Sequence, residues 1–314
     1  MSDPLFSVVI PCFNVAGTVE ETLASVLGQT EQDFEILAVD NNCTDRTGEI
    51  LGKVARIEPR LRIVRQPVQG LSAARNAGIG SARGRHVALI DADDLWDRDY
   101  LETHAAHLDH ARADVSFARV RLIDWGGRAT GQATRPKLAG LMPADLLRSN
   151  PCTAMIVVRR EVFHRVGMFD ESLRRVEDQE WLFRMLAAGF VLAGIDRVLA
   201  SYRISPGGLS ADLEAMLASH GQMLEAAARV APDLVARHRR LAHGGMLRYC
   251  ARRALDHAKG GDAARGYLLR MLGAAPDLLV REPLPTLKVM AAVLLPHLAG
   301  RLERRRGALR TGEV

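Results

Sequence analysis

The amino-acid sequence predicts an α/β protein with a Rossmann-like, mixed but mostly parallel sheet flanked by helices, followed by a helical C-terminal subdomain. Three observations support this prediction. Strand-like and helix-like segments alternate along the first third of the chain, polar residues follow three of the strands directly, and strand patterns stop near residue 208. Strands that alternate with helices are typical of βαβ units, which build parallel sheets. We therefore expect two domains, residues 1–208 and 209–314.

The first third contains four segments with the composition of buried strands, rich in β-branched and other apolar residues. They are FSVVIPCF, FEILAVD, LRIVRQ and HVALID, at residues 6–13, 34–40, 61–66 and 86–91. Each is short enough to be a strand and is bounded by polar or turn-forming residues.

Helix-like segments lie between these strands. Apolar residues at helical spacing predict helices over 19–27 and around 50–54, and the small residues of 72–82 predict a third. Thr18 and Glu21 have the spacing of a capping box, so we expect the Thr18 side chain to cap the first helix.

The rest of the chain changes character twice. Residues 114–204 mix strand and helix patterns in VSFARVRLI, TAMIVVRREVF, EDQEWLFRMLAAGF and VLASYRI. Glycines at 126, 127 and 131 predict a loop that extends to Pro136. From about residue 209, Ala, Leu and Arg recur at helical spacing without a strand pattern, which predicts the helical C-terminal region.

The composition is that of a globular protein with a buried core. Of 314 residues, 48% are hydrophobic and 25% are charged. No secretory signal is visible, and no apolar run reaches the roughly 18 residues of a spanning helix. The four cysteines are scattered without metal-ligand spacing, which favours a reduced, cytoplasmic protein.

Polar side chains follow three of the predicted strands. They lie at residues 11–14, 40–45 and 91–94. Ligands of open α/β sheets bind outside the carboxyl ends of the strands, so these segments should converge on one site.

The sharpest of these signals is the acidic segment Asp91, Asp93 and Asp94, which comes directly after a buried strand. Carboxylates this close repel one another, and a cation would offset that repulsion. Hard oxygen ligands suit Mg²⁺ or Mn²⁺, which bind one or two carboxylates together with substrate phosphates. The alternative is a solvated helix start, which explains Asp94 better than Asp91.

Three further segments carry weaker signals. Asp40 closes a strand, where a carboxylate can accept a hydrogen bond from a base such as uracil. Arg75 lies in the small-residue helix, and Glu177 with Asp178 opens another, where a carboxylate can act as general base. Taken singly, the Asp40 and Arg75 segments are better explained by turn, cap or structural-helix chemistry, and the acidic pair is a weak signal because acids at a helix start are ordinary dipole chemistry.

Together these segments closely resemble the family 2 glycosyltransferases, which have the GT-A fold. The resemblance covers residues 5 to about 205, and the order of the motifs makes chance agreement unlikely. The matching segments are FSVVIPCFN, TVEETLASVLGQT, FEILAVDNNCTDRT, GLSAARNAG, ALIDADD and VEDQEWLFRM.

The resemblance implies roles for individual residues. Asp91 and Asp93 look like the family's DxD pair, which meets the ribose and the metal–diphosphate, with Mg²⁺ or Mn²⁺ as cofactor. Asp178 looks like the catalytic base. The residues assigned to the nucleotide pocket are Pro11, Phe13, Asn14, Asp40 and Arg75. Two departures stand out: Asn42-Cys43 replaces the commoner Gly-Ser, and Ser205 stands where a histidine is frequent.

The implied activity is transfer of a sugar from a nucleoside diphosphate, with UDP favoured, to an acceptor hydroxyl with inversion. Synthesis of a cell-surface polysaccharide or a lipid-linked glycan is the expected setting. A non-catalytic nucleotide-sugar-binding module is the alternative. A dehydrogenase is disfavoured because no GxGxxG follows the first strand, and nucleic acid is not an expected partner.

The last region carries an apolar segment followed by a basic end. Residues 283–314 include Arg301, Arg304, Arg305, Arg306 and Arg310. This pattern fits a helix lying on an anionic membrane at its inner face. A helical hairpin packed on the catalytic domain and a homodimer contact explain it equally well.

Other polar and aromatic residues have plainer explanations. His104, His107 and His110 recur on one helical segment, where an exposed face is favoured over metal binding. Any of Trp96, Trp125 and Trp181 can stack on a sugar, although packing is the default for Trp96.

Overall fold

The computed structural model describes residues 3–153, 155–205, 207–208, 211–255 and 260–295. The chain divides into two compact units. The first, the sheet unit, comprises Met1–Leu146 and Asn150–Ala211, and the second, the helical unit, comprises Leu147–Ser149 and Asp212–Val314.

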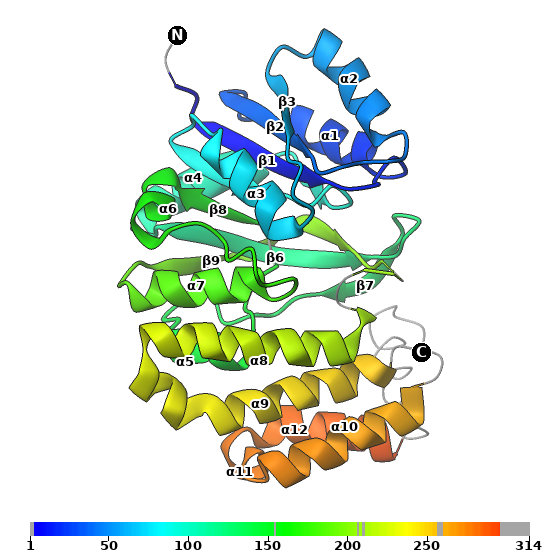
Figure 1. Cartoon of the computed structure of the whole chain (residues 1–314), viewed down its shortest axis with the longest axis vertical. Coiled ribbons are helices and arrows are strands. Elements are labelled where there is room, and N and C mark those ends of the chain that lie inside the picture. The colour runs from blue at the N-terminus through cyan, green and yellow to red at the C-terminus, as the bar shows by residue number, and fades with distance from the viewer. Residues whose placement is uncertain (1–2, 154, 206, 209–210, 256–259, 296–314) are drawn as a thin grey trace, which may run out of the picture. The chain divides into compact units, whose positions relative to one another are not determined.

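One sheet organises the sheet unit, and its parallel part comes from the N-terminal third (Figure 1). The strands lie in the order β3-β2-β1-β4 and all run parallel. The apolar sequences of β1, β2 and β4 follow from burial on both faces, since a parallel sheet is covered on each side by helices, whereas the edge strand β3 is mostly exposed. The bounds are Phe6–Cys12 for β1, Phe34–Asp40 for β2, Leu61–Arg65 for β3 and His86–Leu89 for β4.

The sheet continues from β4 through β8, β6, β9 and β5, and β7 pairs with β6. Only β6 and β9 are parallel here; the pairs β4–β8, β6–β8, β5–β9 and β6–β7 are antiparallel. The sheet is therefore mixed, with its parallel character concentrated in the first four strands. The bounds are Leu95–Trp96 for β5, Val115–Ile123 for β6, Ala129–Ala133 for β7, Ile156–Arg159 for β8 and Leu192–Arg203 for β9.

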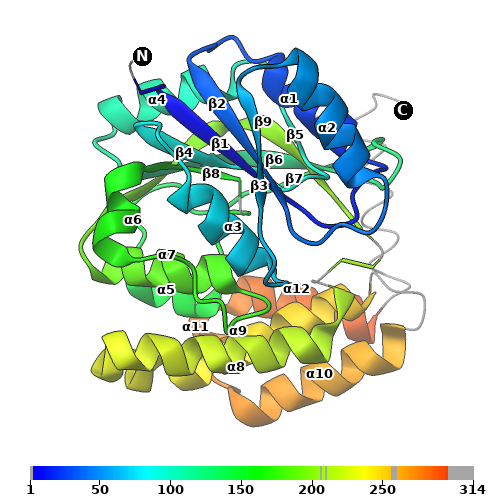
Figure 2. The same cartoon turned by 45° about the horizontal axis from the view of Figure 1, so that its top comes forward.

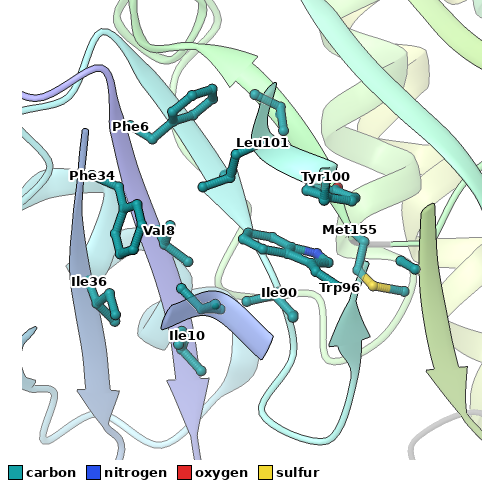
Figure 3. Packing of buried hydrophobic residues seen from close by; sticks show 14 of the residues in the cluster. Phe6, Val8, Ile10, Phe34, Ile36, Ile90, Trp96, Tyr100, Leu101 and Met155 are labelled. Atoms are coloured by element: carbon teal, nitrogen blue, oxygen red, sulfur yellow. The ribbon is translucent and has the colours of Figure 1, made fainter. Parts of the chain in front are cut away.

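Three helices share a hydrophobic core with one face of the parallel strands. Figure 3 shows part of this core, in which Phe6, Val8 and Ile10 of β1 alternate along the strand toward the same side. Trp96 stacks on Tyr100 in this core with ring centroids 4.3 Å apart, so Trp96 packs as expected. The helices are α1 (Val19–Leu27), α2 (Thr47–Ile57) and α4 (Tyr100–His110).

The opposite face of the parallel strands is met by α3 (Leu71–Gly80), seen in front of them in Figure 2. Gly78 lies so close to the sheet that a Cβ there would be 2.4 Å from Val9 Cγ1 and 3.1 Å from Val39 Cγ2. The prediction that small residues bring this helix close to the sheet is confirmed. Three further helices follow: α5 (Pro143–Arg148), whose last two residues belong to the helical unit, and α6 (Arg160–Val166) and α7 (Glu177–Ala187) in the sheet unit.

Two local predictions were wrong. Thr18 precedes α1, but its side chain makes no capping bond; the hydroxyl donates to the carbonyl oxygen of Ala92 at 3.0 Å. The Thr18 side chain is therefore bonded to a residue 74 positions away in the sequence and not to the first turn of α1. The glycine-rich loop after residue 126 is partly strand, because Ala129–Ala133 pairs with β6 as β7.

The helical unit has its own core, to which all of its major helices contribute. Met246, Cys250, Leu268 and Met271 are buried in it, as the helical spacing of the apolar residues predicts. Within the described ranges, no helix has both the length and the apolar character needed to cross a membrane. The helices are α8 (Leu213–Val230), α9 (Pro232–Leu255), α10 (Gly260–Ala274), α11 (Leu278–Arg281) and α12 (Pro283–Leu294).

Candidate active site

The polar segments that follow β1, β2 and β4 lie at the same edge of the sheet. Strand β1 lies between β2 and β4 and runs parallel to both. Cys12 pairs with Asp40 at the ends of β1 and β2, and β4 ends at Leu89, opposite Val9, so the segments after all three strands leave the sheet at the same edge. The predicted convergence of these three segments is confirmed.

The segments after β1 and β2 are joined by hydrogen bonds. Asn14 Oδ1 accepts from the backbone N–H groups of Thr44 at 2.8 Å and Asp45 at 3.3 Å. Asn14 has φ of 52° and Asn42 has φ of 64°, a left-handed conformation that asparagine tolerates better than most residues. Asp40 Oδ1 accepts from the backbone N–H of Cys43 at 3.0 Å, which fixes this turn.

The remaining nucleotide-pocket candidates of β1 differ in exposure. Pro11 is buried within the strand, whereas Phe13 just beyond it is 50% exposed. An exposed aromatic ring at the edge where ligands of such sheets bind offers a face on which a flat base can stack.

Arg75 links two acidic segments that are far apart in the sequence. Its Nη2 donates to Asp91 Oδ1 at 2.7 Å, and its Nη1 donates to Glu177 Oε1 at 2.6 Å. The Arg75 side chain is 1% exposed, that of Glu177 is 6% exposed, and that of Asp91 is 30% exposed. Burial alone would lower the pKa of Arg75, but attraction to Asp91 and Glu177 raises it above its ordinary value.

The segment Asp93–Asp94 is held by a residue from β9. Arg203 donates from Nε to the carbonyl oxygen of Asp93 at 2.7 Å, and its backbone N–H donates to Asp94 Oδ1 at 2.8 Å. It also donates to the carbonyl oxygen of Trp125 at 2.9 Å and to Glu21 Oε2 at 2.6 Å. This buried arginine therefore fixes the backbone on which the acidic side chains stand.

Asp93 and Asp94 are poor acids in this environment. Burial, followed by repulsion from Asp91, raises the pKa of Asp93 to about 6. Burial and the same neighbour raise the pKa of Asp94 well above its ordinary value. Too little positive charge lies near the partly buried Asp93 to stabilise its carboxylate. The side chain therefore takes up a proton as the pH falls below about 6.

This donor set fits a divalent cation that is shared with a ligand. Asp91 and Asp93 are two hard carboxylates whose mutual repulsion a cation would relieve. Among the described residues, no group of three or more His, Cys, Asp or Glu side chains is placed to hold a metal. Two carboxylates leave most of the coordination shell to substrate oxygens and water, as is usual for Mg²⁺.

Asp178 lies at the start of α7, next to Glu177. Its Oδ2 accepts a hydrogen bond from Asn150 Nδ2 at 2.8 Å, and Oδ1 accepts from the backbone N–H of Gln179 at 2.8 Å. Burial and repulsion from Glu177 raise the pKa of Asp178 to about 6, while attraction to Arg75 opposes the shift. A carboxyl with this pKa can take up a proton near neutral pH.

The residue before this acidic pair is conformationally strained. Val176 has φ of 56° and ψ of 20°, in the left-handed region that a β-branched side chain rarely adopts. Such a conformation costs on the order of 1–3 kcal/mol and persists only where the surroundings enforce it. Glu177 and Asp178 are thus presented by a strained helix start.

The histidine and tryptophan candidates lie in different environments. His104 is buried and His104 Nδ1 lies 2.8 Å from Ser116 Oγ, so neither the metal site nor the exposed face describes it. Burial lowers its pKa to about 3, because the core contains little to stabilise the cation. Trp181 is fully buried, whereas Trp125 is 50% exposed and is tied to Arg203.

Two residues of the site carried no usable signal in the sequence. Arg203 lies in the strand-like segment VLASYRI, and Asn150 lies in a segment without a motif. Both act through partners more than 25 residues away, namely Asp93 and Asp178. A pattern that depends on such distant contacts is invisible to local periodicity.

Comparison with known proteins adds a family match. The model of the family described as Glycosyl transferase family 2 matches residues 7–167. The uncharacterized glycosyltransferase EpsJ of Bacillus subtilis (strain 168) is 30% identical over 217 residues, which are 66% of this chain and 63% of EpsJ. The putative teichuronic acid biosynthesis glycosyltransferase TuaG of the same organism is 28% identical over 67% of this chain and 82% of TuaG.

Two solved structures share the fold. S. aureus TarS 1-349 in complex with UDP-GlcNAc has a TM-score of 0.58 at 18% identity, covering 96% of this chain and 92% of TarS 1-349. The mannosyltransferase PcManGT from Pyrobaculum calidifontis, in complex with GDP-Man and Mn²⁺, has a TM-score of 0.59 at 20% identity, covering 94% of this chain and 88% of that one. These likenesses confirm the predicted GT-A fold class.

Proposed function

This chain belongs to glycosyl transferase family 2, and from that premise we propose that it transfers a sugar from a UDP-sugar to an acceptor hydroxyl, with inversion at the anomeric carbon. Its similarity to TuaG supports a role in the synthesis of a cell-surface polysaccharide, with a glycan or a lipid-linked glycan as acceptor. The UDP-GlcNAc bound by TarS supports a uridine donor, and the GDP-Man bound by PcManGT makes guanosine the donor to test against it.

The observation that supports this proposal most strongly is the double ion pair of Arg75. Through Asp91 and Glu177 it joins the segment proposed to bind the donor to the segment proposed to carry the base. A transferase needs both groups in one place, because holding two reactants together supplies much of the rate enhancement.

The donor side of the site has two parts in this proposal. Asp40, Asn14 and Phe13 bind the nucleotide at the ends of β1 and β2, and Pro11 shapes the strand beneath them. Asp91 and Asp93 would hold Mg²⁺ or Mn²⁺. When bound, that cation supplies positive charge that stabilises the departing diphosphate. Arg75, which the resemblance assigns to the nucleotide pocket, is buried and doubly paired, so in this proposal its role in that pocket is to orient Asp91.

Asp178 acts as the general base on the acceptor side. It removes the proton of the acceptor hydroxyl as that oxygen attacks the anomeric carbon, an effect of about 10²- to 10⁴-fold on the rate. Its raised pKa matches this task, because a base titrating near the working pH is the most effective. Asn150 orients the carboxylate by donating to Oδ2.

The decisive experiment measures donor binding and transfer separately. UDP-, GDP- and dTDP-sugars are screened with Mn²⁺ for binding and for hydrolysis or transfer. Asp178→Asn is expected to bind the donor as the wild type does and to lose at least about 10²-fold in turnover. Asp93→Ala is expected to lose metal-dependent donor binding.

Asp196→Asn is the matched control, because Asp196 is a largely exposed carboxylate of β9 that pairs with Arg119. It is expected to behave as wild type. Wild-type turnover by Asp178→Asn would place the base elsewhere. Donor binding without turnover on any acceptor by the wild type would favour the non-catalytic nucleotide-sugar-binding module.

A peripheral position on the inner face of a membrane is part of the proposal. In α12, Leu284 is 70% exposed and Leu287 is 52% exposed, which supports an apolar face available to lipid. The basic residues of 296–314 lie outside the described residues. Deletion of residues 283–314 is expected to abolish flotation with anionic liposomes; unchanged flotation would favour a homodimer contact or a packed hairpin.

A further inference from the structure

A cavity of about 620 Å³ lies in the helical unit, between residues of α9 and α11 and residue 148. Its volume falls within the roughly 300–1,000 Å³ of typical small-molecule sites. The side chains that line it are Arg148, Arg237, His238, Arg240, Leu241, Asp277 and Arg281.

The cavity has an excess of positive charge. Four guanidinium groups line it, against the single carboxylate of Asp277. Asp277 Oδ2 accepts from Arg240 Nη2 at 2.7 Å and also from Arg281 Nε at 3.1 Å, so one carboxylate serves two arginines. Arginines crowded in this way repel one another, and a concave surface focuses the resulting positive potential.

Glu282, five residues after Asp277, is also shared between two arginines. Glu282 Oε1 accepts from Arg148 at 3.0 Å, and its Oε2 accepts from Arg248 at 2.6 Å. Arg237 makes no ion pair with any carboxylate of the described residues. The acids of this region therefore leave positive charge in the cavity uncompensated.

We propose that this cavity binds a phosphate or diphosphate group. Arginine matches phosphate in geometry, because its planar fork donates two parallel hydrogen bonds to two oxygens. The side chains of Arg240 and Arg281 are 58% and 64% exposed, so their free N–H groups are accessible to a ligand from solvent. The buried Leu241 gives the cavity an apolar wall.

Two sources of phosphate have this chemistry: a soluble phosphate compound and a lipid headgroup. Val280, next to Arg281, is 82% exposed, and Leu284 is 70% exposed. Apolar residues beside a phosphate site would accommodate the hydrocarbon part of a lipid. The inference is independent of the sugar-transfer proposal, because every residue lining the cavity belongs to the helical unit.

The test uses the full chain and pyrophosphate, titrated by calorimetry in EDTA and low salt so that metal-dependent binding elsewhere is suppressed. Arg237→Gln is expected to weaken binding about tenfold, the effect of one charge-assisted contact. Arg252→Gln is the matched control, since Arg252 is also exposed on α9 and lies outside the cavity lining; it should bind as wild type does.

Arg237→Gln removes no ion pair within the described residues, so its melting temperature should match that of wild type. Equal affinities of the Arg237→Gln and Arg252→Gln variants, or no pyrophosphate binding by the wild type, would overturn the proposal. Adding Arg281→Gln to Arg237→Gln should weaken binding further.

Flotation with vesicles distinguishes the two sources. Phosphatidylglycerol vesicles that capture the wild type but not Arg237→Gln, with no capture by phosphatidylcholine, identify a lipid phosphate. Pyrophosphate binding that depends on Arg237, with vesicle capture that is absent or independent of Arg237, identifies a soluble phosphate compound. Vesicle capture that is insensitive to Arg237, together with pyrophosphate binding that is equally insensitive, counts against the site.

Discussion

Arg75 is a fully buried cation whose charge is divided between two carboxylates. It sits on α3, and its partners Asp91 and Glu177 come from 16 and 102 residues away in the sequence. Buried charges are tolerated only when they are paired and hydrogen-bonded, so this triad has to form for the site to form.

Replacing Arg75 by methionine is therefore expected to destabilise the protein by about 3–5 kcal/mol, because two carboxylates lose their cation. Urea denaturation measures the change. Arg197→Met is the matched control: Arg197 pairs with Asp99 at 2.8 Å, but both side chains are more than a third exposed. Such a pair contributes about 1 kcal/mol or less. Equal losses in the two variants would contradict the role given to Arg75.

The raised pKa of Asp178 leads to a pH prediction. The proposed base must be ionised, so kcat/KM is expected to fall as pH drops through about 6. Because folding raises this pKa from 3.8, ionised Asp178 costs stability above pH 6, and the cost disappears as the pH falls toward 4.

Asp178→Asn should accordingly raise the free energy of unfolding at neutral pH by on the order of 1–3 kcal/mol, and by progressively less at lower pH. Thermal or urea unfolding at several pH values measures this gain. A gain that stays constant from pH 7 to pH 4 would show that ionisation of Asp178 is not its cause.

At this scale the sequence located acids better than their partners. Asp40, Asp91 and Asp178 could be singled out because they close or follow a strand or lie at a helix start, which are local features. The partner of Thr18 was mispredicted and Arg203 was missed, because their hydrogen bonds to Ala92 and Asp93 depend on how separate segments pack.

Among the elements, α3 shows how the amino-acid composition of a helix sets the distance between that helix and the sheet. Gly78 and Gly80 belong to the same helix, but their surroundings differ. A Cβ on Gly78 would clash with Val9, whereas a Cβ on Gly80 would meet nothing within 4 Å. Arg75 lies on this helix, so its reach toward Asp91 depends on the close approach.

Gly78→Ala is expected to destabilise the protein by about 1–3 kcal/mol through overpacking. Gly80→Ala is expected to be neutral or to stabilise by up to about 1 kcal/mol, because alanine is the better helix former. Chemical denaturation compares the two variants. If Gly78→Ala is as stable as Gly80→Ala, the helix does not need its glycine to approach the sheet.

The order of the first strands and helices was predictable, because burial on both faces makes β1, β2 and β4 almost continuously apolar. The pairing of β6 with β8 and β9, and the existence of β7, were not predictable. All five residues of β7 are exposed, so it carries no apolar pattern to read.

For the molecule as a whole, the proposal that only Asp91 and Asp93 bind the metal predicts that metal and donor bind together. Asp91 and Asp93 alone should hold Mn²⁺ weakly, and the diphosphate of the donor should complete the coordination. Calorimetry is expected to show that UDP-sugar increases the affinity for Mn²⁺, and that Mn²⁺ increases the affinity for UDP-sugar by the same factor.

Chelation should leave the melting temperature of the donor-free protein unchanged, since no group of three or more metal ligands occurs among the described residues. Tight Mn²⁺ binding without nucleotide, or a large loss of thermal stability in EDTA, would contradict this prediction.

The sharing of Arg75 has a consequence for how the site responds to change. If Asp91 loses its charge, the guanidinium is left to Glu177 and Asp178, and the proton affinity of Asp178 must fall. The acids proposed to face the leaving group and the incoming alcohol are thus linked through one buried arginine. A substitution at Asp91 changes the electrostatic environment of Asp178, and the reverse also holds. The free-energy changes of substitutions at the two positions are therefore not expected to be additive.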